Sequence, residues 1–435
     1  MTIPPLTDGE RDWLRVRRYL QDHRYELAAE AATEYPENAR IAGTPLLGAA
    51  AWQPSAPIPL DAIGLEFRPV PAVPRVTGSA GSARRALPRS SDGRPYRRYS
   101  EAMGALAAPG IFEDRPTYRL LEADLAGPRR LVFGRGSYFD GIDTGEASAH
   151  EYAAARLAGG PAGPRAGTAR PAGPRAAPRG GPRGGLRGGL RGGLREAIGD
   201  PCDLTSRPVN LGISTLTIRH DPRSGRASMP LHWRDPAKVG HAGGLYQVIP
   251  VGVFQPSGYA PWNEHNDFGL WRSMLREFAE ELGGEDEDHG SERAPIDYAG
   301  WPFGARLTRA LDSGGIRAYC LGLGTDPLTF ATDLLTVTVF DAPVFDAVFA
   351  GLRLGNAEGR VLTEGAPPGL LRTEDPDGDE RPGGTMPGGA SSMVSPAGLP
   401  FTAGTVSRFA FHEPMQAAGA ALLALAWRHH RALLG

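Results

Sequence analysis

Three glutamates near the middle of the chain, Glu277, Glu280 and Glu281, have a spacing that could bind a divalent metal ion. They fall in a segment, residues 270–282, whose apolar residues recur at the period of a helix. Residues three and four apart lie on one side of a helix, so the three carboxylates would crowd together. Mg²⁺ prefers a few carboxylate oxygens with water and phosphate oxygens. We therefore predict a site for Mg²⁺ or Mn²⁺ that would assist attack of water on a phosphoanhydride.

The other side of the same helix is apolar and would anchor it in a core. Its members are Met274, Leu275, Phe278 and Leu282. Arg276 could pair with a helix carboxylate and fix its orientation. The competing interpretation is a solvated acidic helix face, which many surface helices have.

The stretch from Arg276 to Gly283 resembles the second half of the Nudix box, the motif of the Nudix hydrolases. The matching residues are Arg276, Glu277, Phe278, Glu280, Glu281 and Gly283. The resemblance implies that Glu277, Glu280 and Glu281 are metal ligands and that Arg276 is the structural arginine of the site. It places Arg276 and Glu280 in the catalytic machinery. The implied function is Mg²⁺-dependent hydrolysis of a nucleoside diphosphate linked to another moiety.

The first half of the box departs from the family pattern. Trp262 and Phe268 stand where the family has glycine and glutamate, and the loop of residues 254–269 is longer than usual. Glu264 or Asp267 could supply the early acidic group, and no base is assigned. The alternative function is therefore a sensor that binds a nucleotide or phosphate ligand without catalysis.

A wider resemblance points to the C-terminal regions of actinobacterial regulators of the XRE type. It rests on residues 137–151, which run from Ser137 to Glu151, and on Trp262, Asn263 and Glu264. This resemblance implies that the sensor would belong to a transcriptional regulator. No helix-turn-helix pattern follows the helix predicted at the N-terminus, between Thr7 and about Tyr35.

The elements around the acidic helix predict an α+β fold with a mixed β-sheet, a Nudix-like core with flanking helices. Strands are expected at residues 118–122, 130–134, 209–218, 227–233, 245–254, 316–323 and 334–340. Helices are expected at residues 145–157, 303–313, 342–352 and 414–434.

Two low-complexity insertions divide the chain. The predicted segments are 1–74, an N-terminal helix and extended segment; 75–98, a linker; 99–158, the first part of the core; 159–195, a disordered insertion; 196–363, the Nudix-like domain; 364–399, a flexible loop; and 400–435, a docking helix. The first insertion contains arginine but no acidic residue, so single-stranded nucleic acid is an alternative partner. The absence of aromatic residues there favours a neutral insertion.

Composition limits the remaining function classes. The net charge of -2 gives no general attraction for nucleic acid, and two cysteines are too few for a disulfide scaffold, which favours the cytoplasm. The apolar run at residues 417–427 is too short to span a bilayer, so no membrane partner is expected. The expected partner is a small nucleotide or phosphate ligand.

A second metal or acid-base cluster could be formed by His150 and Glu151, which follow Asp140 and Asp143. The cluster lacks a second histidine at helical spacing, and this absence favours a structural role for these residues.

Overall fold

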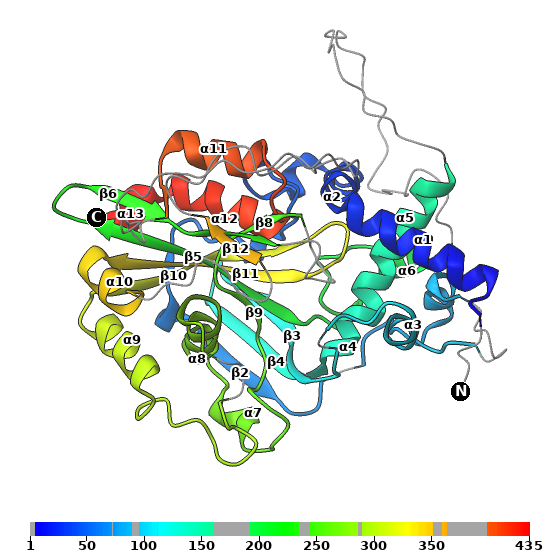
Figure 1. Cartoon of the computed structure of the whole chain (residues 1–435), viewed down its shortest axis with the longest axis horizontal. Coiled ribbons are helices and arrows are strands. Elements are labelled where there is room, and N and C mark those ends of the chain that lie inside the picture. The colour runs from blue at the N-terminus through cyan, green and yellow to red at the C-terminus, as the bar shows by residue number, and fades with distance from the viewer. Residues whose placement is uncertain are drawn as a thin grey trace, which may run out of the picture.

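The fold is α+β with a mixed central sheet, as predicted, in a computed structural model of the chain (Figure 1). The structure describes residues 5–71, 73–88, 95–110, 112–159, 192–234, 244–285, 289–350, 359–362 and 398–435, with the backbone alone at 359, 360 and 362. The two predicted insertions lie outside the described residues at 160–191 and 364–397. No helix among the described residues is long and apolar enough to cross a membrane.

The central sheet has seven strands in the order β1-β10-β11-β5-β6-β13, with β9 also paired to β5. The strands are β1 (Ile58–Pro59), β5 (Leu211–Asp221), β6 (Arg226–Met229), β9 (Val251–Val253), β10 (Ile316–Thr325), β11 (Thr332–Asp341) and β13 (Leu399–Pro400). β11 and β5 run parallel, from Thr332 beside Leu211 to Asp341 beside His220, and the other pairs are antiparallel. The parallel pair brings the starts of β5 and β11 together.

Two three-stranded sheets flank the central one. The first has the order β12 (Gly359–Leu362), β7 (Leu231–Arg234), β8 (Tyr246–Gln247), and the second has the order β2 (Gly64–Arg68), β4 (Arg130–Ser137), β3 (Pro116–Asp124). The predicted strands at 227–233 and 245–254 are each divided, at Pro230 and before Val251 respectively. Proline has no N–H for a ladder, which explains why neither strand is continuous.

Helices cover both faces of the central sheet. On one face, above the sheet in Figure 1, lie α11 (Ala403–Phe411), α12 (Ala417–Arg428) and α13 (His430–Leu434). On the other face lie α7 (Asn263–Asn266), α8 (Leu270–Glu277) and the π-helical turn η7 (Phe278–Gly283). The helices α9 (Pro302–Asp312) and α10 (Ala342–Val348) lie at one end of this face. The docking of the C-terminal helix is confirmed, since Leu422 and Leu423 are fully buried in α12. The predicted single helix is broken at His429.

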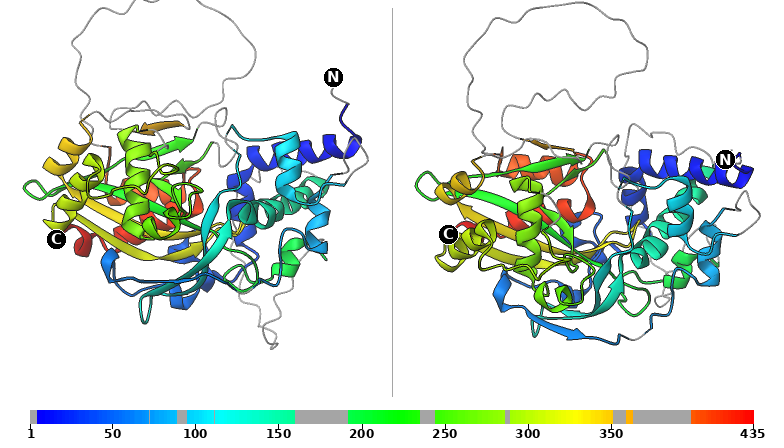
Figure 2. Two further views of the ribbon diagram at one scale, coloured as in Figure 1. Left: turned by 90° about the horizontal axis from the view of Figure 1, so that it is seen from below. Right: turned by 60° about the horizontal axis from the view of Figure 1, so that its bottom comes forward.

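A helical region packs at the end of the sheet where β5 and β11 begin (Figures 1 and 2). It consists of α1 (Asp8–Asp22), α2 (Arg24–Ala32), α3 (Tyr99–Leu106), α4 (Tyr138–Gly141), the π-helical turn η6 (Ile142–Glu146), α5 (Ala147–Ala158) and α6 (Leu194–Ile198). The predicted N-terminal helix begins with the expected capping box of Thr7 and Glu10 but breaks at His23.

Two segments that were predicted to be unstructured are packed. The linker prediction is wrong for residues 75–88, where the turn η5 (Gly81–Ala86) buries Ala83 and Ala86 beside Trp13. Small side chains allow this close contact without a large apolar area. The disorder prediction is wrong for residues 192–195, because Arg195 is buried and donates to the carbonyls of Pro327 and Leu328. The extended segment before residue 75 contributes β1 and β2, which are joined by the short turn η4 (Leu60–Ala62). Three further short turns precede β1: η1 (Glu37–Ala39), η2 (Ile41–Gly43) and η3 (Ala50–Trp52).

Candidate functional site

The acidic helix predicted at residues 270–282 forms, but its second half is not α-helical. α8 ends at Glu277 and continues as the π-helical turn η7 to Gly283. Its apolar side is buried in the core as expected, with Met274, Leu275 and Phe278 at most 1% exposed. A π turn has hydrogen bonds to the fifth residue along, so the spacing argument for three carboxylates on one side does not hold beyond Glu277.

Arg276 organises the interior beneath this helix. Its guanidinium is buried, donates to the Tyr298 hydroxyl at 2.5 Å and to the Gln255 carbonyl at 2.6 Å, and lies 3.7 Å from the carboxylate of Asp267. Asp267 also accepts hydrogen bonds from the backbone N–H and hydroxyl of Ser257, at 2.8 and 2.6 Å. Arg276 therefore links its helix to Tyr298, Gln255 and Asp267 in the interior of the protein.

The structure distinguishes the two acidic residues considered for the early position of the motif. Asp267 is fully buried beside Arg276. Glu264 instead accepts two hydrogen bonds from Arg135, at 2.6 and 2.8 Å, on the outside of the molecule. Asp267 is therefore the acidic partner of the motif arginine.

The three glutamates point to different neighbours. Glu281 accepts a hydrogen bond from the backbone N–H of Val251 at 2.8 Å, and Glu280 lies 3.3 Å from Nε2 of His289. Glu277 lies against Gly252, where any Cβ atom would overlap its carboxylate. Glu277 and Glu280 share a cavity of about 20 Å³ with Arg276 and His289, which is room for one water molecule or two.

Among the described residues, no group of three or more Asp, Glu, His or Cys side chains is arranged to hold a metal ion. Glu277, Glu280 and Glu281 thus do not present a ready set of oxygens for Mg²⁺ or Mn²⁺. The metal site stays a prediction from the sequence.

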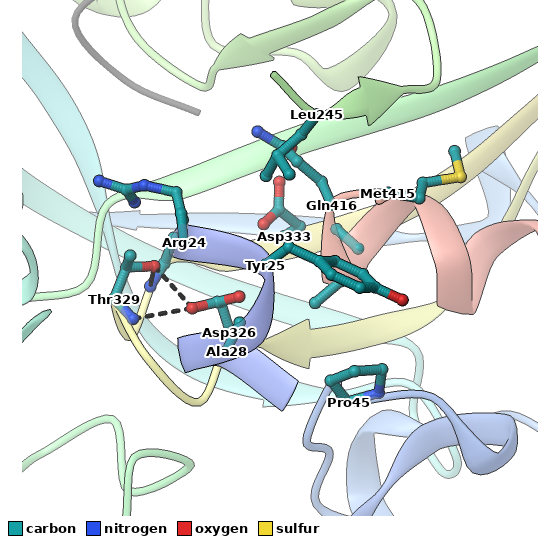
Figure 3. Close-up of a pocket in the computed structure, with 13 residues that line it drawn as sticks. Arg24, Tyr25, Ala28, Pro45, Leu245, Asp326, Thr329, Asp333, Met415 and Gln416 are labelled. Atoms are coloured by element: carbon teal, nitrogen blue, oxygen red, sulfur yellow. Dashed lines mark hydrogen bonds between the residues drawn. The ribbon is translucent and has the colours of Figure 1, made fainter. Parts of the chain in front are cut away.

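A much larger cavity, of about 260 Å³, lies where β5 and β11 begin and the π turn η6 faces them. We call it the sheet-end cavity. The charged and amide side chains of its lining are Glu146, Arg207, Asn210, Arg234, Gln247, Asp333 and Gln416. A side chamber of about 60 Å³ adjoins it beneath α2 and shares Thr329, Ala331, Asp333 and Gln416 (Figure 3).

Arg207 is the most unusual residue of this lining. Its side chain is 1% exposed, and its Nη2 donates to the Phe330 carbonyl at 2.5 Å and to the Thr332 hydroxyl at 3.3 Å. The other terminal nitrogen, Nη1, has no hydrogen-bond partner among the described residues, and no carboxylate forms an ion pair with Arg207 there. Burial lowers the pKa of this guanidinium to about 10, so it still carries its charge at neutral pH. A buried cation with an unpaired N–H donor is stabilised when an anion binds it.

Asp333 faces the cavity from the start of β11. The Ser214 hydroxyl donates to its Oδ1 at 3.0 Å, and burial raises the pKa of this carboxyl to about 6. The neighbouring Gly212 leaves space for it, since a Cβ there would lie 2.5 Å from the same oxygen. Asp333 therefore carries a negative charge at neutral pH with little to stabilise it.

Glu146, in the π turn η6, lines the cavity and forms ion pairs with two arginines. Arg17 of α1 donates to it, and Arg24 of α2 donates to both of its carboxylate oxygens at 3.0 Å. All three side chains are at most 5% exposed. The cluster is net positive by one charge, whereas the charged side chains that line the sheet-end cavity itself are balanced: Arg207 and Arg234 against Glu146 and Asp333.

The second cluster considered from the sequence has structural partners. His150 is stacked on Trp13 and lies 3.1 Å from the Tyr99 hydroxyl, and burial lowers its pKa to about 3. Glu151 accepts from the backbone N–H groups of Leu194 and Arg195, and Asp143 accepts from that of Ser100. These contacts favour the structural interpretation. Cys202 and Cys320 are free, as expected.

Sequence reasoning did not find Arg207 or Asp333. The only signal was that Asp333 comes directly before the apolar strand predicted at residues 334–340, since Asp is seldom buried without a partner. The polar lining comes from segments far apart in the chain, and no local pattern links them.

No protein-family model matches the sequence, and no curated protein matches it. The likeness to the Nudix hydrolases therefore rests on residues 276–283 alone.

Proposed function

We propose that this protein is a non-catalytic sensor that binds a small nucleotide or other phosphate-bearing ligand in the sheet-end cavity. The observation that carries the proposal is Arg207, a buried guanidinium that lines the cavity with its Nη1 free among the described residues. Within this proposal the phosphate of the ligand accepts a hydrogen bond from Nη1 and neutralises the buried charge.

The surroundings of Arg207 support an anionic ligand. Arg234 also lines the cavity, and the cluster of Glu146 with Arg17 and Arg24 is net positive. With its side chamber, the cavity reaches the lower end of the range for small-molecule sites, roughly 300 Å³. The amides of Asn210, Gln247 and Gln416 offer further hydrogen bonds.

The contacts of the three glutamates on the acidic helix support a site that does not catalyse hydrolysis. Glu281 is engaged with the backbone of Val251, Glu280 with His289, and the space beside Glu277 and Glu280 is far too small for a diphosphate. The resemblance to XRE-type regulators suggests that the ligand signal is read out in transcription.

The proposal is tested by measuring thermal stability and phosphate release with a panel of nucleotides and nucleoside diphosphate derivatives, each with and without Mg²⁺. We expect one or more compounds to raise the melting temperature without turnover. Arg207→Gln should abolish the shift. Because this variant could also lower stability, Ala331→Phe serves beside it: Ala331 is exposed and lines both chambers, so the larger side chain should block the site with little effect on folding.

A second candidate, the Mg²⁺-dependent hydrolase, is favoured by one observation: Glu277 and Glu280 line the same small cavity as Arg276. Mg²⁺-dependent turnover that is lost in Glu277→Gln and retained in Ala331→Phe would support the hydrolase and overturn the sensor. Stabilisation that persists in both cavity variants would contradict the proposed site.

A further inference from the structure

Asp333 is a half-buried carboxylate on the cavity wall, and it has no cationic partner among the residues that the structure describes. Among the described residues its one hydrogen bond comes from the neutral hydroxyl of Ser214, and no ion pair to Asp333 is found there. The charge of another acid, Asp326, raises the pKa of Asp333 further. Enclosing such a group costs free energy that a positively charged partner would offset.

The arginines around the cavity are engaged with other groups. Arg24 donates to both oxygens of Glu146, and Arg234 donates to the side-chain oxygen of Gln247 at 3.3 Å. Arg207 donates to Phe330 and Thr332. Movement of any of these arginines onto Asp333 would break contacts that are already made, so none of the described arginines pairs with Asp333 without such a loss.

Asp333 and Arg207 nevertheless belong to one cavity. Arg207 contacts the hydroxyl of Thr332, the residue directly before Asp333 in β11, and both line the sheet-end cavity without pairing with each other. Figure 3 shows the Asp333 carboxylate beside Gln416, at the junction with the side chamber. The cavity therefore presents a cationic group that would bind an anion, at Arg207, and an anionic group that would bind a cation, at Asp333, to the same space.

We propose that the ligand is an amino phosphate: its phosphate binds Arg207 and a primary ammonium group, elsewhere on the same molecule, binds Asp333. This inference rests on the proposed sensor function and narrows it to a class of ligand. The Asp333 carboxylate accepts from the ammonium on the oxygen that Ser214 leaves free. Gln416 offers its amide oxygen beside it.

The test uses pairs of probes that differ only in the ammonium group: glucosamine 6-phosphate against glucose 6-phosphate, and phosphoethanolamine against ethyl phosphate. Binding to the full chain is measured by calorimetric titration at pH 7.5, where Asp333 is charged because burial raises its pKa only to about 6. The wild-type protein should bind at least one amino member about tenfold or more tightly than its neutral twin.

Two variants locate the effect. Asp333→Asn keeps an acceptor for Ser214 and removes the charge, so it should bind both members of the pair alike, at the affinity of the neutral twin. Ala331→Phe should bind neither member. Thermal denaturation of each variant without ligand confirms that it is folded.

The outcomes separate this inference from the function on which it rests. If the wild-type protein binds both twins equally, or if Asp333→Asn still prefers the amino member, Asp333 does not bind the ammonium group. Either result contradicts this inference and leaves the proposed phosphate sensor unaffected. Failure of the amino phosphates and of the nucleotide panel alike to bind overturns both.

Discussion

At the scale of single residues, the unpaired carboxylate of Asp333 makes stability depend on pH. Burial raises its pKa from 3.8 to about 6, so the folded protein binds this proton more tightly than the unfolded chain does. The stability contributed by the proton is present at about pH 4 and is lost as pH rises through about 6. Asp333→Asn should therefore raise the free energy of unfolding at pH 7 by about 1–3 kcal/mol and change it little at pH 4. Denaturant titrations at both pH values check this, and an equal gain at both would contradict it.

Glu281 is predicted to stabilise the fold through its hydrogen bond from Val251, whether or not it binds metal. Glu281→Ala removes the acceptor and should cost about 1–2 kcal/mol in the free energy of unfolding. Glu281→Gln keeps a side-chain oxygen in the same place and should cost clearly less. Urea denaturation without added metal measures both. Two variants as stable as the wild-type protein would show that the contact contributes nothing.

The chemistry of residues was only partly predictable from the sequence. The spacing around Arg276 correctly placed an apolar helix side in the core, because periodicity is local information. For the early acidic position of the box the sequence offered Glu264 or Asp267, and which of them lies beside Arg276 depended on how a long loop folds. The sequence predicted a carboxylate of the helix itself as the partner of Arg276, and the structure places Asp267 of the preceding loop there. Arg207 and Asp333 were missed because their environment is created by segments more than a hundred residues apart.

At the scale of elements, the π-helical turn η6 lies in close contact with the backbone of a neighbouring segment. In η6, Gly145 lies so close to the Thr329 carbonyl that a Cβ atom would overlap it. Gly145→Ala should therefore cost about 1–3 kcal/mol, because a fixed backbone cannot give way. Gly104 in α3 is a matched control: an added Cβ would meet Phe112 at 3.4 Å, an ordinary contact. Gly104→Ala should raise stability by about 0.5–1 kcal/mol. Thermal melting of both variants tests the contrast, which fails if the two behave alike.

The sequence predicted which helices and strands form more accurately than it predicted where each one begins and ends. Strands β10 and β11 and helix α9 lie within two residues of their predicted bounds, because uninterrupted apolar patterns define them. The interruptions at Pro230 and Pro250 were visible as residues, yet the pattern did not show that each would separate strands of different sheets. The π turns were not predictable, since a helical pattern over a few residues is the same for both helix types.

At the scale of the whole molecule, one buried cluster joins the N-terminal helices to the cavity wall. Arg17 of α1 and Arg24 of α2 both bind Glu146 in η6, and Glu146 lines the sheet-end cavity. A ligand in the cavity would thus touch the group that holds two helices in place. Docking of these helices and occupancy of the cavity are expected to be linked.

Removal of the Glu146 charge should loosen the N-terminal helices. Glu146→Gln leaves two buried guanidinium groups without a counter-charge and should cost about 3–5 kcal/mol. Glu122 is the matched control, because it also binds two arginines, Arg68 and Arg130, but all three side chains are more than 40% exposed. Glu122→Gln should cost no more than about 1 kcal/mol, since water screens exposed pairs. Hydrogen exchange gives a local readout: in Glu146→Gln the amides of α1 and α2 should exchange faster while those of β10 and β11 stay protected. Equal costs for the two variants would mean that the buried cluster does not dock the helices.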